Sequence, residues 1–548
     1  MNGCLNSDAF FTAFVSLFFN IRILHHLRNH NLKNDNNLIL FIIVTNRWCF
    51  EMKNRIKRLI EMTLTTCFPW IERKDGVVQF VDPLDKKEIS AHYGVTHMAV
   101  ALIIYGNIKN DSELISKGEE LLFSIFERWD NSKALPDFHN DFNNFSLCVL
   151  DNFTDNYHEK ITSAVLDTED TFFDTVNWLP MRWYVNRSRY NWTHDDAYLE
   201  KCKVCAKKIK EATYSDGFID DMIPKGRSFS LQYDIATVAF MQFLRTAGED
   251  LDLSKETGAL LNAVCPDGDI NYFGRGTNQI FAWSLWIYLL SSSGLSELNR
   301  ALDYLENRLA DMLAKNNIML NDYSGEEKYM WWDYHYCSVY TAHLLFWLVM
   351  ALKDYDKMNI EPVLVEDGSS GVHIYRNSNA FVAAFEGRTE YLAEAGPAIE
   401  AVWTKRSGTV CKGTFGPWYG LFGNKYIQAD AALKNFLGLN EIKTGRRDPI
   451  FRSFISKINL KKKQRSLTEK LCFIKPDVSC SDGVRIIYHP DKLPVLLNLP
   501  SFNGEIHVKT DGNEVELSDS MQIRNQYGWL KIKQKIIESC DEIEILII

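Results

Sequence analysis

The sequence predicts a multidomain α-then-β fold: an (α/α) toroid of helical hairpins over residues 52–354, then an antiparallel β-sandwich over residues 371–548. Two periodicities predict it. In the first part apolar residues recur every three or four positions, and beyond residue 370 they alternate with polar ones. About ten to twelve helices joined by polar loops must pack on one another, and pairs of about 40 to 55 residues suit a closed ring.

Length and charge limit the function. A chain of 548 residues is too long for one ordinary core. Its 13% aromatic residues suit thick helical cores or stacking platforms for sugar rings. The formal charge of −10 argues against binding nucleic acid through its phosphates. We therefore expect no nucleic-acid partner.

The cysteines and the N-terminus bear on location. Twelve scattered cysteines are typical of reduced thiols and favour a cytoplasmic protein. Cys202 and Cys205 form a C-x-x-C, but it lies in a helical pattern without a second pair, so we expect no metal site and no cofactor. Residues 1–51 carry two apolar runs too short for a confident membrane span. We expect a non-core extension before a natural start at Met52, with a signal anchor as the alternative and no stable membrane insertion.

The helical pattern recurs along the whole first part of the chain. Its clearest segments are residues 55–64, 93–106, 113–129, 170–185, 199–212, 231–244, 279–290, 298–313 and 337–353.

The residue pattern changes from helical to strand-like near residue 355. Residues 355–370 contain Pro, Gly and Ser and are predicted to be a linker. Strand-like segments rich in β-branched and aromatic residues then follow within residues 371–387, 408–423, 483–500, 504–519 and 529–548.

The stretch from 266 to 291 is the most informative for function. Turn formers precede a Gly-Arg-Gly and a helix predicted from about Gln279, with Thr277 or Asn278 as its cap. Arg275 would then lie at a helix N-terminus, where unpaired N–H groups and a guanidinium favour a carboxylate or sulfate. We count Tyr272 and Gln279 as substrate-binding residues beside it. The simpler alternative is a tight turn with a solvated Arg.

Three more loops place polar or aromatic residues directly before an apolar helix. In the first of these loops, helix caps account for one or two of the five polar residues. In the other two, a core tyrosine at Tyr233 and packing between the domains are the open alternatives. In a ring of hairpins such junctions gather at one end, so we expect the loops at 137–145, 229–234, 271–279 and 331–336 to meet in one cleft. The candidate residues of these three loops are His139, Asn140, Asn143, Tyr233, Trp331, His335 and Tyr336.

This combination is similar to the heparinase II/III-type polysaccharide lyases. The shared features are an Asn- and His-bearing early loop (LPDFHNDFNNFSL), a tyrosine in SLQYD, a late aromatic His-Tyr cluster and the α-then-β order, over residues 53–548. The resemblance implies that Asn143 or Asn140 neutralises a uronate carboxylate and Tyr233 transfers a proton. It also implies His139 or His335 as partner base. The chain departs from those lyases, which tend to have Tyr-His where it has Tyr233-Asp234.

The chemistry of uronate elimination needs the same residue types. The C5 proton becomes acidic enough to remove only when amide or guanidinium donors hold the neighbouring carboxylate. A Tyr or His then takes that proton, and another protonates the departing oxygen. The expected partner is thus an acidic polysaccharide or oligosaccharide, and the expected activity is that of a polysaccharide lyase.

Two alternatives stay open. A glycoside hydrolase on the same scaffold would need two carboxylates, for which Asp141, Asp220, Asp221 and Asp333 are available. A non-catalytic glycan-binding protein would use the aromatic loops for stacking alone.

Overall fold

The structure is a computed structural model. It describes residues 36–132, 139–171, 175–226, 229–274, 279–314, 336–386, 398–419, 421–422, 425–426, 476–490, 495–525 and 527–548.

The chain divides into two compact units, Met1–Arg55 and Ile56–Ile548. Helix α3 (Asn36–Cys67) continues through position 52, where the sequence suggested that the folded protein begins. The boundaries at 51, 354 and 370 stay predictions. Within the described part of the chain, no helix combines the length and the apolar character that a membrane span needs.

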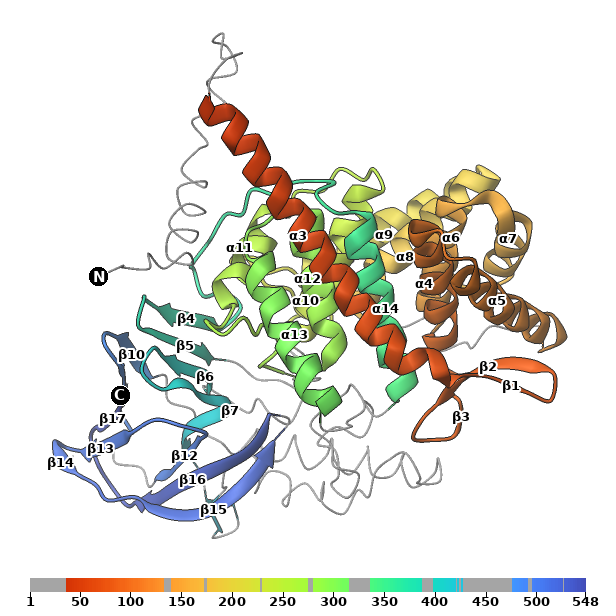
Figure 1. Ribbon diagram of the computed structural model, residues 1–548. Helices are drawn as coiled ribbons and strands as arrows, with labels where there is room; N and C mark the ends of the chain where they lie inside the picture. The colour runs from red at the N-terminus through yellow and green to blue at the C-terminus, as the bar shows by residue number, and fades with distance from the viewer. Residues whose placement is uncertain are drawn as a thin grey trace, which may run out of the picture. The chain divides into compact units, whose positions relative to one another are not determined.

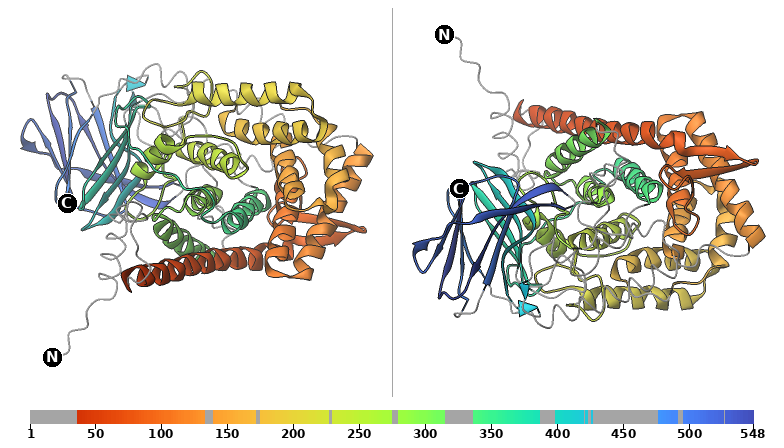
Figure 2. Two further views of the ribbon diagram at one scale, coloured as in Figure 1. Left: turned by 90° about the horizontal axis from the view of Figure 1, so that it is seen from above. Right: turned by 90° about the horizontal axis from the view of Figure 1, so that it is seen from below.

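Six helices of the second unit form a closed ring (Figures 1 and 2). Each contacts the next one in the ring, and the last contacts the first. They are α4 (Gly94–Lys109), α6 (Asn140–Phe153), α8 (Leu179–Thr193), α10 (Leu231–Thr246), α12 (Ile280–Ser292) and α14 (Cys337–Lys353).

Five further helices each pack against the ring helix that precedes them in sequence. They are α5 (Ser112–Ser132), α7 (His158–Leu166), α9 (Asp196–Ala212), α11 (Ser254–Ala263) and α13 (Leu298–Ala314). The prediction of a helical first part with helices packed on helices is confirmed. Its described strands are one short antiparallel meander, β1 (Ile71–Lys74), β2 (Val77–Asp82) and β3 (Lys87–Glu88).

Aromatic side chains fill the interior of the ring. The indole of Trp347 on α14 lies 5.1 Å from the ring of Phe240 on α10 and 4.9 Å from that of Tyr288 on α12, between centroids. Phe145 on α6 stacks on the same indole at 5.9 Å. All four are buried, so this level of the ring is a packed core.

Two local features hold α14 against α4 where the ring closes: a close helix contact and a pair of hydrogen bonds. A Cβ on Gly94 would lie 2.8 Å from the Cα of Val339, so only glycine lets the two helices approach this closely. Asp82 at the end of β2 accepts hydrogen bonds from the Ser338 backbone N–H (2.9 Å) and hydroxyl (3.1 Å). It therefore satisfies the first turn of α14 from a distant part of the chain.

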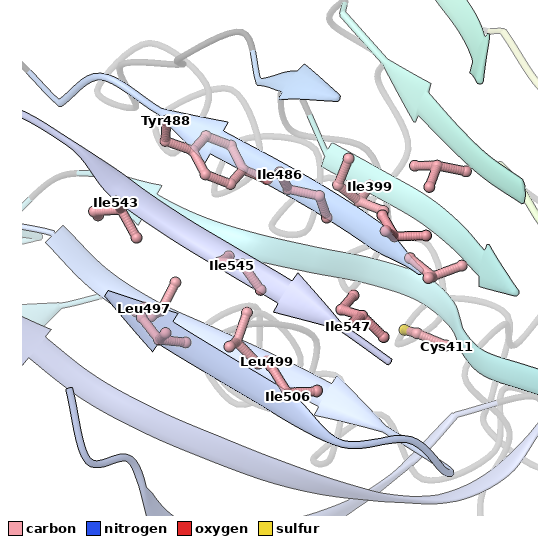
Figure 3. Packing of buried hydrophobic residues seen from close by; sticks show 14 of the residues in the cluster. Ile399, Cys411, Ile486, Tyr488, Leu497, Leu499, Ile506, Ile543, Ile545 and Ile547 are labelled. Carbon is pink, nitrogen blue, oxygen red and sulfur yellow. The ribbon is translucent and has the colours of Figure 1, made fainter. Parts of the chain in front are cut away.

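The second part of the chain is antiparallel, as predicted. One sheet has seven strands in the order β15-β16-β12-β7-β6-β5-β4, and another has five in the order β10-β11-β17-β13-β14. Residues of both sheets form one hydrophobic cluster, which includes Val410, Ile486, Leu499 and Ile545 (Figure 3).

The strand bounds are as follows. The seven-stranded sheet contains β4 (Val372–Arg376), β5 (Ala380–Phe385), β6 (Ala398–Thr404), β7 (Gly408–Tyr419), β12 (Val495–Ser501), β15 (Ser518–Asn525) and β16 (Gly528–Ile537). The five-stranded sheet contains β10 (Asp477–Cys480), β11 (Val484–Tyr488), β13 (Ile506–Thr510), β14 (Asn513–Glu514) and β17 (Ile543–Ile547), and β8 (Leu421–Phe422) pairs with β9 (Lys425–Tyr426).

The central indole gives a stability prediction. We expect Trp347→Ala to lower the free energy of unfolding by about 3–5 kcal/mol, because it leaves a cavity among rings of three other helices. Urea unfolding followed by circular dichroism measures the change. The control Val204→Ala, on the exposed face of α9, should change it by less than about 0.5 kcal/mol. Equal losses in the two variants would contradict a packed ring interior.

Candidate active site

The N-terminal ends of the ring helices meet at one end of the ring. His139, which precedes α6, contacts the rings of His92 before α4 and Trp178 before α8. His92 also contacts Tyr336, which precedes α14. The α10 and α12 ends are joined through the loop between α11 and α12, because the Leu231 N–H donates to the Phe273 carbonyl and the Asn271 amide donates to the Gln279 carbonyl. Helix N-termini gathered in this way favour an anion.

Four aromatic side chains form what we call the rim cluster: His92, His139, Trp178 and Tyr336. Ring centroids of His139 and His92 are 4.1 Å apart, those of His92 and Tyr336 are 4.8 Å apart, and those of His139 and Trp178 are 5.9 Å apart. His139 is buried, whereas the other three are half-buried. The cluster therefore combines a sheltered imidazole with rings that solvent reaches.

His139 has a defined protonation state. Its Nδ1 lies 2.9 Å from the carbonyl oxygen of Ala91, which can only accept a hydrogen bond, so Nδ1 carries the proton and the lone pair of the neutral ring is on Nε2. Burial lowers the pKa of His139 to about 4. The ring is consequently neutral near pH 7, as a general base must be.

A second layer of rings lies directly below the rim cluster. Tyr93 stacks on Phe142 at 4.3 Å and lies 5.4 Å from His139, and His97 lies 5.1 Å from His343. Phe281 on α12 completes the layer at 5.3 Å from His343. This layer is buried and connects the rim cluster to the aromatic core around Trp347.

The two histidines of this second layer are neutral. Burial lowers the pKa of His97 to about 3, and burial together with the neighbouring His97 lowers that of His343 well below its usual value. His97 Nδ1 donates to the Tyr93 carbonyl at 3.1 Å, and neither His97 Nε2 nor His343 Nδ1 has a hydrogen-bond partner among the described residues. Protonation of either ring would place an unpaired charge in this layer.

The two predicted asparagines differ in their surroundings. Asn143 accepts a hydrogen bond from the Thr96 hydroxyl at 2.6 Å and donates to the His139 carbonyl at 3.3 Å. It therefore braces α6 against α4. Asn140 is the first residue of α6, and its buried Oδ1 has no partner among the described residues. Of the two, Asn140 is the one whose side-chain oxygen does not hold neighbouring helices together.

The predicted residues of α10 and α12 lie farther around the ring. Tyr233 is half-buried in the first turn of α10, and its carbonyl accepts the Thr237 hydroxyl. Gln279 is the buried N-cap residue of α12, in the place expected for Thr277 or Asn278. Tyr272 is 2% exposed, and its hydroxyl donates to the Ala263 carbonyl at 2.7 Å. Such burial weighs against direct contact of Tyr272 with a substrate.

Several predicted positions lie outside the described residues. They are Arg275, Thr277, Asn278, Trp331, His335 and the carboxylate candidate Asp333. The site roles assigned to all of the predicted residues stay predictions.

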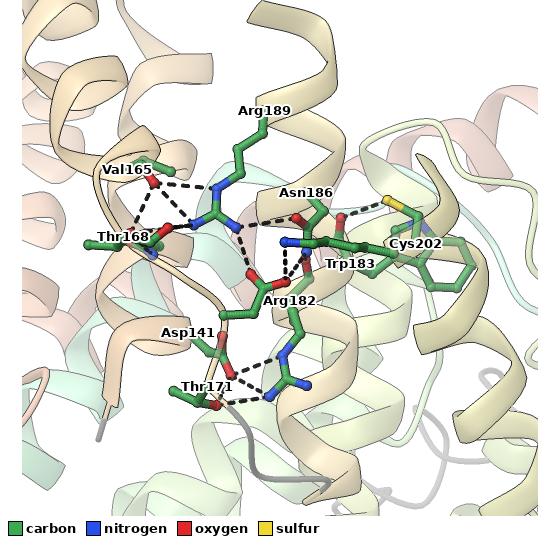
Figure 4. Close-up of polar contacts among 12 residues, drawn as sticks. Asp141, Val165, Thr168, Thr171, Arg182, Trp183, Asn186, Arg189 and Cys202 are labelled. Carbon is green, nitrogen blue, oxygen red and sulfur yellow. Dashed lines mark hydrogen bonds and ion pairs between the residues drawn. The ribbon is translucent and has the colours of Figure 1, made fainter. Parts of the chain in front are cut away.

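The three candidate carboxylates for hydrolysis that lie in the described residues are held in structural bonds. Asp141 binds Arg182 at 2.9 Å and Thr171 at 2.8 Å between α6 and α8, next to a second network around Arg189 (Figure 4). Asp220 accepts the Met222 and Gly226 backbone N–H groups and the Tyr214 hydroxyl. Asp221 accepts the Asn177 N–H, and all three aspartates are buried.

Asp234, the departure from the Tyr-His pattern, is a buried carboxyl. Its side chain is 1% exposed and faces the backbone N–H of Ile219. Neither carboxyl oxygen forms a hydrogen bond with the usual distance and angle to any described residue. Burial raises its pKa well above the usual value, and the nearby acids Glu256, Asp216 and Asp220 add to the effect. The described surroundings therefore favour the protonated acid.

Three residues near His139 are missing from the sequence prediction: His92, Trp178 and His343. The spacing of five positions between His92 and His97 argues against one helix face that holds a metal, so it gives no reason to select His92. The structure places His92 before α4 and His97 inside it, and Tyr93 connects them. The available signal was the junction itself, since His92 and Tyr93 directly precede an apolar helix. In the described part of the chain, no three His, Cys, Asp or Glu side chains are grouped so that they could hold a metal ion.

Comparisons with known proteins give a fold-level likeness. No protein-family model and no curated protein matches the chain. The GH76A alpha-1,6-mannanase from Salegentibacter sp. HEL1_6 is similar at a TM-score of 0.38 and 13% identity, over 55% of this chain and 99% of that one. An unsaturated glucuronyl hydrolase specific for heparin is similar at a TM-score of 0.40 and 12% identity, over 57% of this chain and 97% of that one.

The unsaturated glucuronyl hydrolase from Streptococcus agalactiae is similar at a TM-score of 0.36 and 13% identity, over 56% of this chain and 92% of that one. At these values the likeness says nothing of this chain's reaction. None of the three structures is a heparinase II/III-type lyase, so that resemblance stays a prediction.

The buried histidines give a pH prediction. The pKa of His97 is about 3 in the folded state and about 6.5 in the unfolded chain. Its stabilising contribution is therefore complete above about pH 6.5 and is lost as pH falls towards 3. We expect His97→Gln to show a smaller fall in Tm between pH 7 and pH 4 than the wild type, because the variant cannot be protonated there.

The exposed His489 provides a matched control. The slope of Tm against pH is compared by scanning fluorimetry, since His97→Gln also alters packing. An equal flattening of the slope in His489→Gln would contradict the assignment to the buried layer.

The buried Asp234 gives a prediction of opposite sign. Its pKa is raised in the folded state, so its stabilising contribution is complete below about pH 3.8 and is lost as pH rises towards the folded value. We expect Asp234→Asn to raise Tm at pH 7.5 and to raise it less at pH 4. A difference in Tm that does not change with pH would show that ionisation of Asp234 is not what limits stability.

Proposed function

We propose that this protein is a carbohydrate-active enzyme that cleaves a uronate-containing glycan by β-elimination at the N-terminal ends of the ring helices. The observation that carries the proposal is the state of His139. It is a neutral imidazole with its lone pair on Nε2, and its ring centroid lies 4.1 Å from that of His92, which in turn lies 4.8 Å from the ring of Tyr336. A neutral imidazole can accept a proton and a tyrosine hydroxyl can donate one, which are the two transfers that elimination requires; burial makes this imidazole a weaker base than an exposed one.

The proposed reaction assigns one role to each kind of group. An amide at the start of α6, in Asn140, binds the uronate carboxylate and makes the C5 proton more acidic. His139 Nε2 takes that proton, a C4–C5 double bond forms, and the C4–O bond breaks. A tyrosine hydroxyl, from Tyr336 or Tyr233, protonates the departing oxygen. Half-buried aromatic rings such as Trp178 would stack on the sugar.

Convergent helix N-termini suit an acidic glycan better than a neutral one. Their partial positive charges attract a carboxylate even though the chain as a whole is negative. The predicted cytoplasmic location and the absence of a required cofactor belong to the same proposal.

Hydrolysis is the second candidate reaction. It requires two carboxyl groups on either side of the bond that breaks. Asp141, Asp220 and Asp221 are buried in structural bonds, so the described residues favour elimination over hydrolysis by these candidates.

An assay of product chemistry tests the proposal. Purified protein is incubated with a panel of uronate-containing glycans and with neutral glycans. We expect new reducing ends together with ultraviolet absorbance from the conjugated double bond, on uronate substrates only. Reducing ends without absorbance would establish hydrolysis instead, and binding without either product would favour a glycan-binding protein.

Substitutions identify the proton-transfer groups. We expect His139→Gln to lower kcat by about 10²- to 10⁴-fold while glycan binding, measured by calorimetry, changes little. Tyr336→Phe and Tyr233→Phe are compared because each removes only a hydroxyl, and the variant with the larger loss identifies the acid. Near wild-type turnover in His139→Gln would reject His139 as the base.

A further inference from the structure

The loop between α11 and α12 is held from the side of the β strands. Lys412 on β7 is 3% exposed, and its Nζ lies 2.7 Å from Asp267 Oδ2 and 2.8 Å from Asp269 Oδ2. Thr409 donates to the same Asp267 oxygen at 2.9 Å. A buried lysine between two carboxylates fixes its partners closely, because breaking the set would leave an unpaired buried charge.

Tyr527, between β15 and β16, binds the same loop at a second point. Its hydroxyl lies 2.9 Å from Asp269 Oδ2 and 2.6 Å from the carbonyl oxygen of Asn271, so its single proton is shared between two acceptors of the loop. The other oxygen of Asp269 accepts the Asn271 N–H at 2.8 Å and the Trp283 indole N–H at 3.2 Å. The loop is thereby fixed to α12 as well.

The far end of this loop sets the start of α10. The Phe273 carbonyl accepts the Leu231 N–H, which is one of the N–H groups that a helix leaves without an intrahelical partner. Gly274 has φ of +91°, and a Cβ there would lie 2.6 Å from the Cα of Ser230. The loop backbone thus packs directly against the residue that precedes the turn containing Tyr233.

The same loop also reaches the start of α12 through one side chain. The side-chain amide of Asn271 donates to the backbone carbonyl of Gln279 at 3.2 Å and lies 3.5 Å from the side-chain Oε1 of Gln232. A continuous set of contacts therefore leads from Lys412 and Tyr527 to the first turns of two ring helices.

We propose that Tyr527 and Lys412 are positioning residues of the candidate active site, which hold residues 265–274 so that the first turn of α10, with Tyr233, is correctly placed. This inference rests on the proposed function. It gives the β strands a part in catalysis without requiring them to touch the substrate.

Tyr527→Phe in the full chain tests the inference, because it removes one hydroxyl and keeps the ring. We expect kcat on the uronate substrate to fall by at least about tenfold with KM within about threefold, since small displacements of catalytic groups cost rate. Hydrogen exchange should rise at residues 268–274 and 231–236. Thr409→Val, which removes only one bond to Asp267, should give a smaller effect of the same kind.

Ser370→Ala is the matched control. It removes a 2.7 Å hydrogen bond to Asp216 Oδ2, which joins the start of the second part of the chain to a different loop of the helical part. We expect its kcat to stay within about twofold of the wild type and its exchange at 268–274 to be unchanged. If Ser370→Ala and Tyr527→Phe have the same Tm and lose kcat to a similar extent, the inference is overturned. A kcat of Tyr527→Phe within about twofold of the wild type would also overturn it.

Failure of the proposed function has a separate signature. If the wild type cleaves no glycan of the panel, the reaction is wrong, and exchange alone decides the positioning role. Unchanged exchange at 231–236 in Tyr527→Phe would then overturn it, and raised exchange there with none in Ser370→Ala would support it.

Discussion

Closure of six helices into a ring is the constraint on which the rest of this structure depends. A closed ring leaves an interior that must be filled, and here the indole of Trp347 meets rings from three other helices. Closure also brings the starts of the ring helices together. Their unpaired N–H groups and the loops that precede them consequently share one end of the ring, and the candidate site is built there.

The interior changes character along the ring. Around Trp347 it is an ordinary aromatic core. Above this core, His97 and His343 are buried but neutral, because their environment cannot solvate a charge. At the rim, half-buried rings surround His139, whose tautomer is fixed by one backbone carbonyl. A base that is neutral, oriented and close to solvent follows from this gradual change in burial.

The loop at 265–274 shows why the second part of the chain matters to the first. Its Asp267 and Asp269 are paired with a lysine from a strand, and its backbone contacts the start of α10. A buried ion pair adds little net stability compared with apolar packing, but loss of one partner leaves an uncompensated buried charge. Specific placement of the loop is the consequence that bears on function.

The sequence by itself determined most of the helices, the antiparallel strands and the residue types at the loop-to-helix junctions. The helix expected over residues 170–185 begins only at Leu179, and α7 and α11 were not among the predicted segments. The expected helix from about residue 279 begins at Ile280, and the one expected at Cys337 begins there. These features depend on neighbours along the chain, so local periodicity reveals them. His139 and Tyr336 could be selected for the same reason, as polar rings placed just before apolar helices.

Only the tertiary structure decided which of these residues meet. His92 joins His139 because α4 and α6 are adjacent in the ring, and Asp141 is committed to Arg182 because α8 packs beside α6. Nothing in its local sequence distinguishes Lys412 from a lysine on an exposed strand, yet it is buried against two aspartates of a distant loop. Such pairings depend on ring closure and on packing between distant segments, and a local sequence pattern carries no information about either.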